Sequence, residues 1–257
     1  MSKVAFITGA AQGIGAGIAE RLAKDGFDIA IADLPFQKEK AAEVINKVEE
    51  NGHKGIFLEL DVTNQQAFVD AVDKTVEELG DLNVLVNNAG VAKVDSVVDI
   101  KPEDLELSFK INVFGVVYGM QAAAKKFKAL GHPGKIINAS SIAGLKAFPV
   151  WGTYSASKFA VVGFTEAAAA ELAPDHITVN AYAPGVVGTT GMWDDIDAKM
   201  SKLNGKPLGQ NKQDFIDQIP LGRTVLPSDV VNLVAFLSGP DSDYMTGNAI
   251  RVDGGMK

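Results

Sequence analysis

The sequence contains no cysteine, which excludes disulfide bonds, thiolate metal sites and cysteine nucleophiles. It has only three histidines, His53, His132 and His176, which are too scattered to predict a metal site. Residues 176–193 carry no acidic or basic side chain apart from His176, but Pro184 and several glycines argue against a membrane span. We therefore expect a cytoplasmic protein with no metal ion and no membrane partner.

Basic residues are too few to favour nucleic acid as a partner. The chain has 24 lysines and arginines against 32 aspartates and glutamates, a formal charge of −8. Such a surface repels phosphate backbones, and no long run of basic residues offsets this. Three acidic residues, Asp194, Asp195 and Asp197, could together hold a cation, although a solvated helix face is the favoured interpretation.

Apolar segments typical of buried strands alternate with amphipathic helical segments along all 257 residues. This alternation predicts the α/β class, with a Rossmann-type doubly wound parallel sheet covered by helices on both faces. We expect one domain, residues 1–257, with a short helical substrate lid at about 188–223. The expected strands lie near 4–8, 27–32, 55–62, 83–90, 136–141, 177–184 and 248–255, and the expected helices near 16–26, 38–51, 65–79, 103–130, 152–170 and 227–237.

A glycine-rich turn, TGAAQGIG from Thr8 to Gly15, joins the first predicted strand to the first predicted helix. Gly9, Gly13 and Gly15 allow the backbone to turn sharply and to approach a pyrophosphate, which the helix N-terminus attracts. The spacing differs from the usual GxGxxG, and a purely structural turn is the alternative. The position between strand and helix favours dinucleotide binding.

Asp33 ends the second predicted strand, where a carboxylate can accept hydrogen bonds from ribose hydroxyls. A carboxylate at this place repels a 2′-phosphate, and Lys38 is the only nearby cation. NAD is therefore favoured over NADP as the cofactor. A simple loop or capping aspartate is the alternative.

Ser141, Tyr154 and Lys158 form the strongest candidate for a reaction site. Ser141 lies at the end of a predicted strand, and Tyr154 and Lys158 are four residues apart on one face of the next helix. An ammonium group roughly 4 Å from the phenol would stabilise the phenolate by about 4 kcal/mol. That is enough to bring a tyrosine pKa from about 10 to near neutrality. The alternative is an ordinary helix start with a surface Tyr and Lys.

The predicted helix at 103–130 is apolar around most of its middle, so we expect it to be buried on two sides. One side can cover the sheet, and the other requires a second subunit. The helix near 155–170 also carries a face of small residues suited to an interface. Asn112 lies in the apolar helix, where a satisfied core asparagine is the default interpretation.

These motifs, with Asp61-Val62, NNAG, YSASK, PGVVGT and the terminal DGG, resemble the short-chain dehydrogenase/reductase family over essentially the whole chain. The resemblance implies that Tyr154 is the acid/base, that Lys158 lowers its pKa and holds the nicotinamide ribose, that Ser141 binds the reacting oxygen and that Asn112 anchors a relay water. It also implies a homotetramer. The implied NAD contacts, together with the glycine turn, are Gly9, Gln12, Gly13, Ile14, Gly15, Asp33, Asp61, Val62, Asn88, Gly90, Tyr154, Lys158, Pro184, Gly185, Val187 and Thr189.

Three segments, FKALGHPGKIINASS, GMWDDIDAKMSKLNGKPLG and PDSDYMTGNAIRVDGGM, further resemble the family's acetoin (diacetyl) reductases and 2,3-butanediol dehydrogenases. This implies an apolar pocket for a small uncharged ketone or diol, formed by Ile142, Phe148, Met192 and Trp193 beside Ser141 and Tyr154. Ile142 and Phe148, at opposite ends of the pocket, would favour an S-configured carbinol. The alternatives are a 3-oxoacyl-carrier-protein reductase, a sugar or other alcohol dehydrogenase, and a non-enzymatic NAD sensor.

Overall fold

A parallel sheet forms the centre of the computed structural model, which describes residues 2–188 and 191–256, with only the backbone at 191 and 192. Within these residues the strand order is β3-β2-β1-β4-β5-β6-β7, and every neighbouring pair is parallel. The order reverses between β1 and β4, where α/β proteins bind ligands. The strands are β1 (Lys3–Thr8), β2 (Phe27–Asp33), β3 (Gly55–Glu59), β4 (Val84–Asn87), β5 (Lys135–Ala139), β6 (Thr178–Pro184) and β7 (Ala249–Val252).

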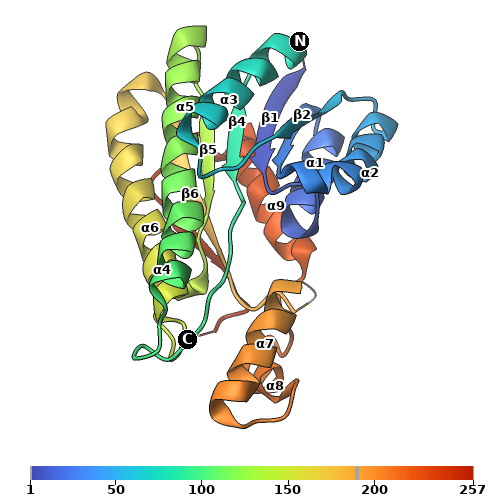
Figure 1. The fold of residues 1–257 in the computed structure, drawn as a ribbon. Coiled ribbons are helices and arrows are strands. Elements are labelled where there is room, and N and C mark those ends of the chain that lie inside the picture. The colour runs from blue at the N-terminus through green and yellow to red at the C-terminus, as the bar shows by residue number, and fades with distance from the viewer. Residues whose placement is uncertain (1, 189–190, 257) are drawn as a thin grey trace.

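Helices cover both faces of the sheet, as the alternating pattern predicts (Figure 1). One layer contains α1, α2 and α9, and the other contains α3, α5 and α6. The predicted Rossmann-type fold is thus confirmed. The helices are α1 (Gly13–Lys24), α2 (Lys38–Glu50), α3 (Gln65–Leu79), α4 (Pro102–Phe109), α5 (Gly115–Leu130), α6 (Gly152–Leu172), α7 (Gly191–Asn204), α8 (Gln210–Ile216) and α9 (Pro227–Ser238).

Two apolar cores lie on the two faces of the sheet because successive strand residues point to opposite sides. In β1, Ala5 and Ile7 pack with α1, α2 and α9, whereas Phe6 packs with α3 and α5. All three side chains are fully buried. Burial on both faces explains why the central strands are apolar throughout rather than alternating.

The helix predicted at 103–130 is interrupted. It consists of α4, a π-helical turn at Lys110–Phe114 and α5. A 3.6-residue apolar pattern does not reveal a single wide turn, so the sequence could not predict the interruption. The π-turn contains Asn112, and such turns in a helix frequently occur at functional sites.

The segment between β6 and α9 contains α7 and α8, which extend beyond the carboxyl ends of the strands (Figure 1). This segment corresponds to the predicted lid. Its helices are more regular than the short pieces expected, since α7 alone has 14 residues. In the described part of the chain, no helix combines the length and apolarity needed to cross a membrane.

Candidate active site

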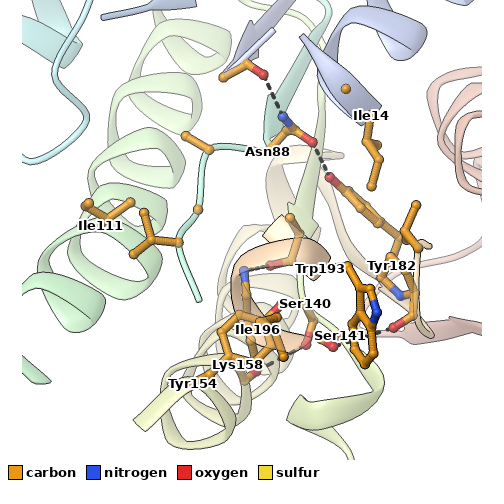
Figure 2. A pocket seen from close by; sticks show the side chains of 18 of the residues that line it. Ile14, Asn88, Ile111, Ser140, Ser141, Tyr154, Lys158, Tyr182, Trp193 and Ile196 are labelled. Atoms are coloured by element: carbon orange, nitrogen blue, oxygen red, sulfur yellow. Dashed lines mark hydrogen bonds between the residues drawn. The ribbon is translucent and has the colours of Figure 1, made fainter. Parts of the chain in front are cut away.

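A cavity of about 940 Å³ opens at the carboxyl ends of the strands, where the sheet order reverses. Figure 2 shows Ile14 and Asn88 toward one end and Ser141, Tyr154 and Lys158 gathered at the other. Most of the predicted site residues therefore line one continuous space. Those that line it are Gly9, Gln12, Gly13, Ile14, Asp33, Asp61, Val62, Asn88, Gly90, Ser141, Ile142, Phe148, Tyr154, Lys158, Pro184, Gly185, Val187 and Trp193.

The glycine turn brings the start of α1 to the cavity. Gly9 and Gly13 have φ values of 64° and 60°, a region that favours glycine. A Cβ at Gly15 would lie 2.3 Å from the Gly9 carbonyl oxygen, so this glycine permits close packing of α1 on the turn rather than lining the cavity. No side chain caps the N-terminus of α1, so its N–H groups can bind an anion.

The Asp33 carboxylate is held at the end of β2 by two backbone donors. Ala11 N–H donates to Oδ2 at 3.0 Å, and Leu34 N–H donates to Oδ1 at 2.8 Å. These bonds connect the glycine turn to the carboxylate and leave lone pairs free for hydroxyl donors. Asp61, the other acidic residue predicted here, accepts from Thr63 N–H and Oγ1 at 2.9 and 2.8 Å, and does not cap α3, whose N-cap is Asn64.

Asn88 joins three strands beneath the cavity. Its Nδ2 donates to the carbonyls of Thr8 and Gly9, each at 3.0 Å, and its Oδ1 accepts from the Tyr182 hydroxyl at 2.9 Å (Figure 2). The side chain therefore fixes the glycine turn relative to β4 and β6. Tyr182 was not among the predicted site residues, although its place near the end of the predicted strand at 177–184 was a usable signal.

Asn112 is a satisfied core asparagine and does not line the cavity. It exchanges two hydrogen bonds with the Val91 backbone, accepting from N–H and donating to the carbonyl, each at 2.8 Å, and it donates to Ser157 Oγ at 3.0 Å. A Cβ at Gly90 would lie 3.2 Å from Asn112 Oδ1 and 3.4 Å from Lys158 Nζ. Asn112 therefore positions the Gly90–Val91 segment, while its role toward a water remains a prediction.

Tyr154, Ser141 and Lys158 meet at the end of β5, because α6 places Tyr154 and Lys158 one turn apart. Ser141 is hydrogen-bonded to the Tyr154 hydroxyl. Ser140 Oγ instead donates to the Lys158 carbonyl at 3.2 Å. Lys158 Nζ donates to the Ala139 carbonyl at 2.7 Å and lies 5.7 Å from the Tyr154 ring centre.

The charge states of this group differ from the sequence-based expectation. Burial raises the pKa of the Tyr154 phenol, and the hydrogen bond with Ser141 offsets only part of that increase. Burial also lowers the pKa of Lys158 to about 8. In this structure burial outweighs the influences that lower the pKa of Tyr154, and the Lys158 ammonium donates its hydrogen bond to the Ala139 carbonyl. A further positive charge is needed to favour the phenolate.

Aromatic side chains close the end of the cavity next to Tyr154. Trp193 is buried and lines the cavity, as predicted, whereas Thr189 and the Met192 side chain lie outside the described residues. The placement of Ile142 and Phe148 at opposite ends was wrong. Both pack in one apolar cluster with Ile219 and Met256, because the turn after β5 brings residues 142–148 back to the same wall.

Two aromatic residues that were not predicted, Trp151 and Phe215, line the same end of the cavity. Trp151 lies three positions before Tyr154, the spacing of one helical turn, so its proximity could have been predicted. Phe215 comes from α8, more than 60 positions along the chain, and only the tertiary fold brings it to the site.

The acidic residues of the lid do not form a metal centre. Asp194 and Asp195 are exposed at the cavity, but Asp197 is buried, contrary to the expected solvated face, and accepts from Gly209 N–H at 2.6 Å. Among the residues that the structure describes, no group of acidic or histidine side chains is placed to hold a metal ion.

The two ends of the cavity fit the two ends of a dinucleotide. The turn from Gly9 to Gly13 and the free N–H groups of α1 suit a pyrophosphate, and Asp33 suits the hydroxyls of an adenosine ribose. At the other end, Lys158 and Tyr154 lie where a ribose and a reacting group would meet. These residues therefore fit NAD, with a smaller apolar space left beside Tyr154.

Comparisons with known proteins agree with this geometry. Residues 3–201 match the family described as short chain dehydrogenase. The chain is 55% identical to L-2,3-butanediol dehydrogenase of Corynebacterium glutamicum, covering 100% of this chain and 99% of the relative. It is 48% identical to a diacetyl reductase [(S)-acetoin forming] of Staphylococcus epidermidis, with the same coverage of both chains.

Solved structures of other dehydrogenases have closely similar folds. An NAD⁺-bound xylitol dehydrogenase has a TM-score of 0.94 at 33% identity, covering 98% of each chain. A carveol dehydrogenase from Mycobacterium avium in complex with NAD has a TM-score of 0.91 at 33% identity, covering 99% of this chain and 97% of the other.

Proposed function

Because the chain belongs to the short-chain dehydrogenase family, we propose that it interconverts diacetyl, acetoin and 2,3-butanediol. It is an oxidoreductase that uses NAD to interconvert secondary alcohols and ketones. The observation that carries the proposal is the Ser141–Tyr154 hydrogen bond at the apolar end of a cavity that fits NAD. Two relatives that align along the whole chain, a butanediol dehydrogenase and a diacetyl reductase, support the choice of substrate.

In the proposed reaction, Tyr154 moves the proton. In reduction its hydroxyl donates a proton to the ketone oxygen, and in oxidation its phenolate takes the proton from the alcohol. Ser141 donates a hydrogen bond to the same oxygen and so orients the carbonyl. NAD supplies the hydride chemistry when it is bound. Lys158 would hold the nicotinamide ribose, and Asp33 the adenosine ribose.

The aromatic wall beside Tyr154 favours a small uncharged substrate. Phe148, Trp151, Trp193 and Phe215 pack with ring centres 5.4 to 6.2 Å apart, and this leaves little polar surface for a carrier protein arm or a sugar. A four-carbon diketone matches such a space in size and polarity. We also propose that the carbinol formed has the S configuration, and the support for this is the S-acetoin product named for the Staphylococcus epidermidis relative rather than the placement of Ile142 and Phe148.

The test is reduction of diacetyl with NADH and NADPH in parallel, followed by chiral chromatography of the product. We expect NADH to be preferred and S-acetoin to predominate. Tyr154→Phe is the matched control, since it removes only the proton donor and should lower turnover by at least about 10²-fold while leaving NADH binding intact. Predominantly R-acetoin would contradict the proposed stereochemistry, and a fully active Tyr154→Phe variant would contradict the assigned role.

We also propose that the enzyme is a homotetramer and that it is located in the cytoplasm. A tetramer with two-fold axes requires two separate self-complementary surfaces. The first is suggested by Phe114, Phe159 and Phe164, which are 44 to 46% exposed at the start of α5 and along α6. The second is suggested by Phe236 on α9 and the fully exposed Tyr244 near the free edge at β7.

A further inference from the structure

A smaller cavity, of about 50 Å³, lies behind one wall of the large cavity. Ile142 and Phe148 line both cavities and therefore separate them. A side chain with open space on two sides lacks the packing contacts that would otherwise fix its position. The position of this wall therefore depends on the residues behind it.

Met256 packs behind the wall. It is 2% exposed and forms a buried apolar cluster with Ile142 and Ile219, against which Phe148 and Phe215 also pack. Among the described residues of this cluster, Met256 is the one that lines the small cavity without lining the large one. It therefore supports the wall from the side that the ketone does not reach.

The turn after β7 holds Met256 in this place. The Asp253 carboxylate is 6% exposed and accepts a hydrogen bond from Arg251 Nε at 2.6 Å. The Arg251 guanidinium also donates to the Met256 carbonyl. Gly254 has a φ of 67°, and a Cβ at this residue would lie 2.7 Å from Ile219 Cγ2. The turn is thus tightly packed and hydrogen-bonded, which fixes the backbone at Met256.

We propose that Met256 is a positioning residue that limits the length of the ketone, because it keeps Ile142 and Phe148 from moving back into the small cavity. This inference rests on the proposed function, in which a ketone binds beside Tyr154. A wall that cannot recede rejects a ketone with one extra methylene by about 10-fold or more. The length limit is therefore set in part by a side chain that the substrate does not contact.

Two symmetrical diketones test the proposal, since hexane-3,4-dione has one more methylene at each end than diacetyl. Met256→Ala removes every side-chain atom beyond Cβ, and the space left joins the small cavity. Ile142 and Phe148 can then move back. The ratio of kcat/KM for hexane-3,4-dione to kcat/KM for diacetyl, measured with NADH, should rise about 10-fold over the wild type.

Two control variants separate this effect from a general loss of packing. Met256→Leu keeps a similar volume and should leave the ratio within about 3-fold of the wild type. Met245→Ala makes the same truncation at a partly buried methionine that lines neither cavity, and the ratio should not change.

An equal change in kcat/KM for both diketones in Met256→Ala would indicate a merely structural role and would overturn the proposal. An equal rise of the ratio in Met245→Ala would also overturn it. If the wild type reduces neither diketone, the proposed substrate fails. Met256 is then tested with butan-2-one and hexan-3-one, which differ by the same two methylenes, so the two failures are distinguishable.

Arg251→Gln covers the case in which Met256→Ala does not fold. The Arg251 side chain is 49% exposed, so its replacement removes the donor to the Met256 carbonyl without removing buried apolar atoms. The ratio should rise in the same direction but by less, about 3-fold, because one hydrogen bond is lost rather than a side chain. An unchanged ratio in Arg251→Gln would contradict the inference.

Discussion

The lysine beside the reacting tyrosine carries a measurable energetic penalty. Lys158 is 3% exposed, and burial lowers its pKa to about 8, whereas an unfolded lysine has a pKa of about 10.4. Below about pH 8 both states are protonated and the folded state bears the full penalty, on the order of 3 kcal/mol. Between about pH 8 and pH 10.4 the unfolded state binds more protons, so the free energy of unfolding rises with pH.

Lys158→Met removes this dependence. We expect the free energy of unfolding of the wild type, measured relative to the variant, to increase by about 2.5 kcal/mol from pH 8 to pH 10.4. The Ala139 carbonyl loses its hydrogen-bond donor in the variant. The resulting change in the free energy of unfolding does not depend on pH. Urea unfolding of both NAD-free proteins across this range measures the difference, and a constant difference would contradict the pKa.

Residues that are close in sequence were the easiest to predict. Tyr154 and Lys158 are one helical turn apart, and Ser141 follows a buried strand, so local spacing was enough to place them together. The direction of the Tyr154 pKa shift was not predictable in this way, since it depends mainly on how deeply the tertiary fold buries the phenol. Phe215 reaches the cavity from a distant segment, and no local pattern indicates its direction.

At the level of elements, one ion pair connects α7, in the segment predicted to be a lid, to the loop that precedes α6. Lys199 Nζ lies 2.7 Å from Asp95 Oδ2, and its hydrogen bond is the main cause that holds the pKa of Asp95 below its ordinary value. Asp95 in turn holds the Val150 carbonyl. The position of α7 is therefore coupled to the start of α6.

Lys199→Ala should loosen this connection and raise KM for the ketone by about 2- to 5-fold, with the Kd for NADH unchanged. The expected effect is small, because a partly exposed ion pair contributes at most about 1 kcal/mol. Steady-state kinetics at low and high salt would measure the change in KM for the ketone. High salt should reduce the difference in KM between the variant and the wild type. Lys202→Ala, at an exposed site on the same helix, is the control, and equal effects from the two variants would exclude a specific role.

The elements themselves were largely predictable, since apolar runs and amphipathic periods are local properties. Helix α3 was predicted at the bounds it has in the structure, and Asp33 was correctly placed at the end of β2. The π-turn at Lys110–Phe114 was missed because it alters the hydrogen-bond register without altering the apolar pattern. The length of α7 was underestimated because that segment is rich in acidic and basic residues rather than strongly amphipathic.

At the scale of the whole molecule, the family and the use of NAD were predicted from the order of motifs along the chain, and both are confirmed. The assembly remains a proposal that can be tested by light scattering. We expect the wild type to have the mass of four chains and Phe164→Glu to form smaller species, because a carboxylate on α6 would be buried without a partner. Phe36→Glu, at a phenylalanine that is 76% exposed on another surface, is the control. A Phe164→Glu variant that remains a tetramer would exclude α6 as an interface.

The two sides of the sheet reversal between β1 and β4 contribute different parts of the cavity. The cavity residues proposed to bind the dinucleotide come mainly from the first 90 residues, whereas the wall proposed to face the ketone comes from residues 142–151 and from α7 and α8. Mutations in residues 142–151, α7 or α8 can therefore change which carbonyl compound the enzyme accepts, while the binding of NADH is unchanged. A fold arranged in this way can acquire a new substrate specificity through changes in a single loop or helix.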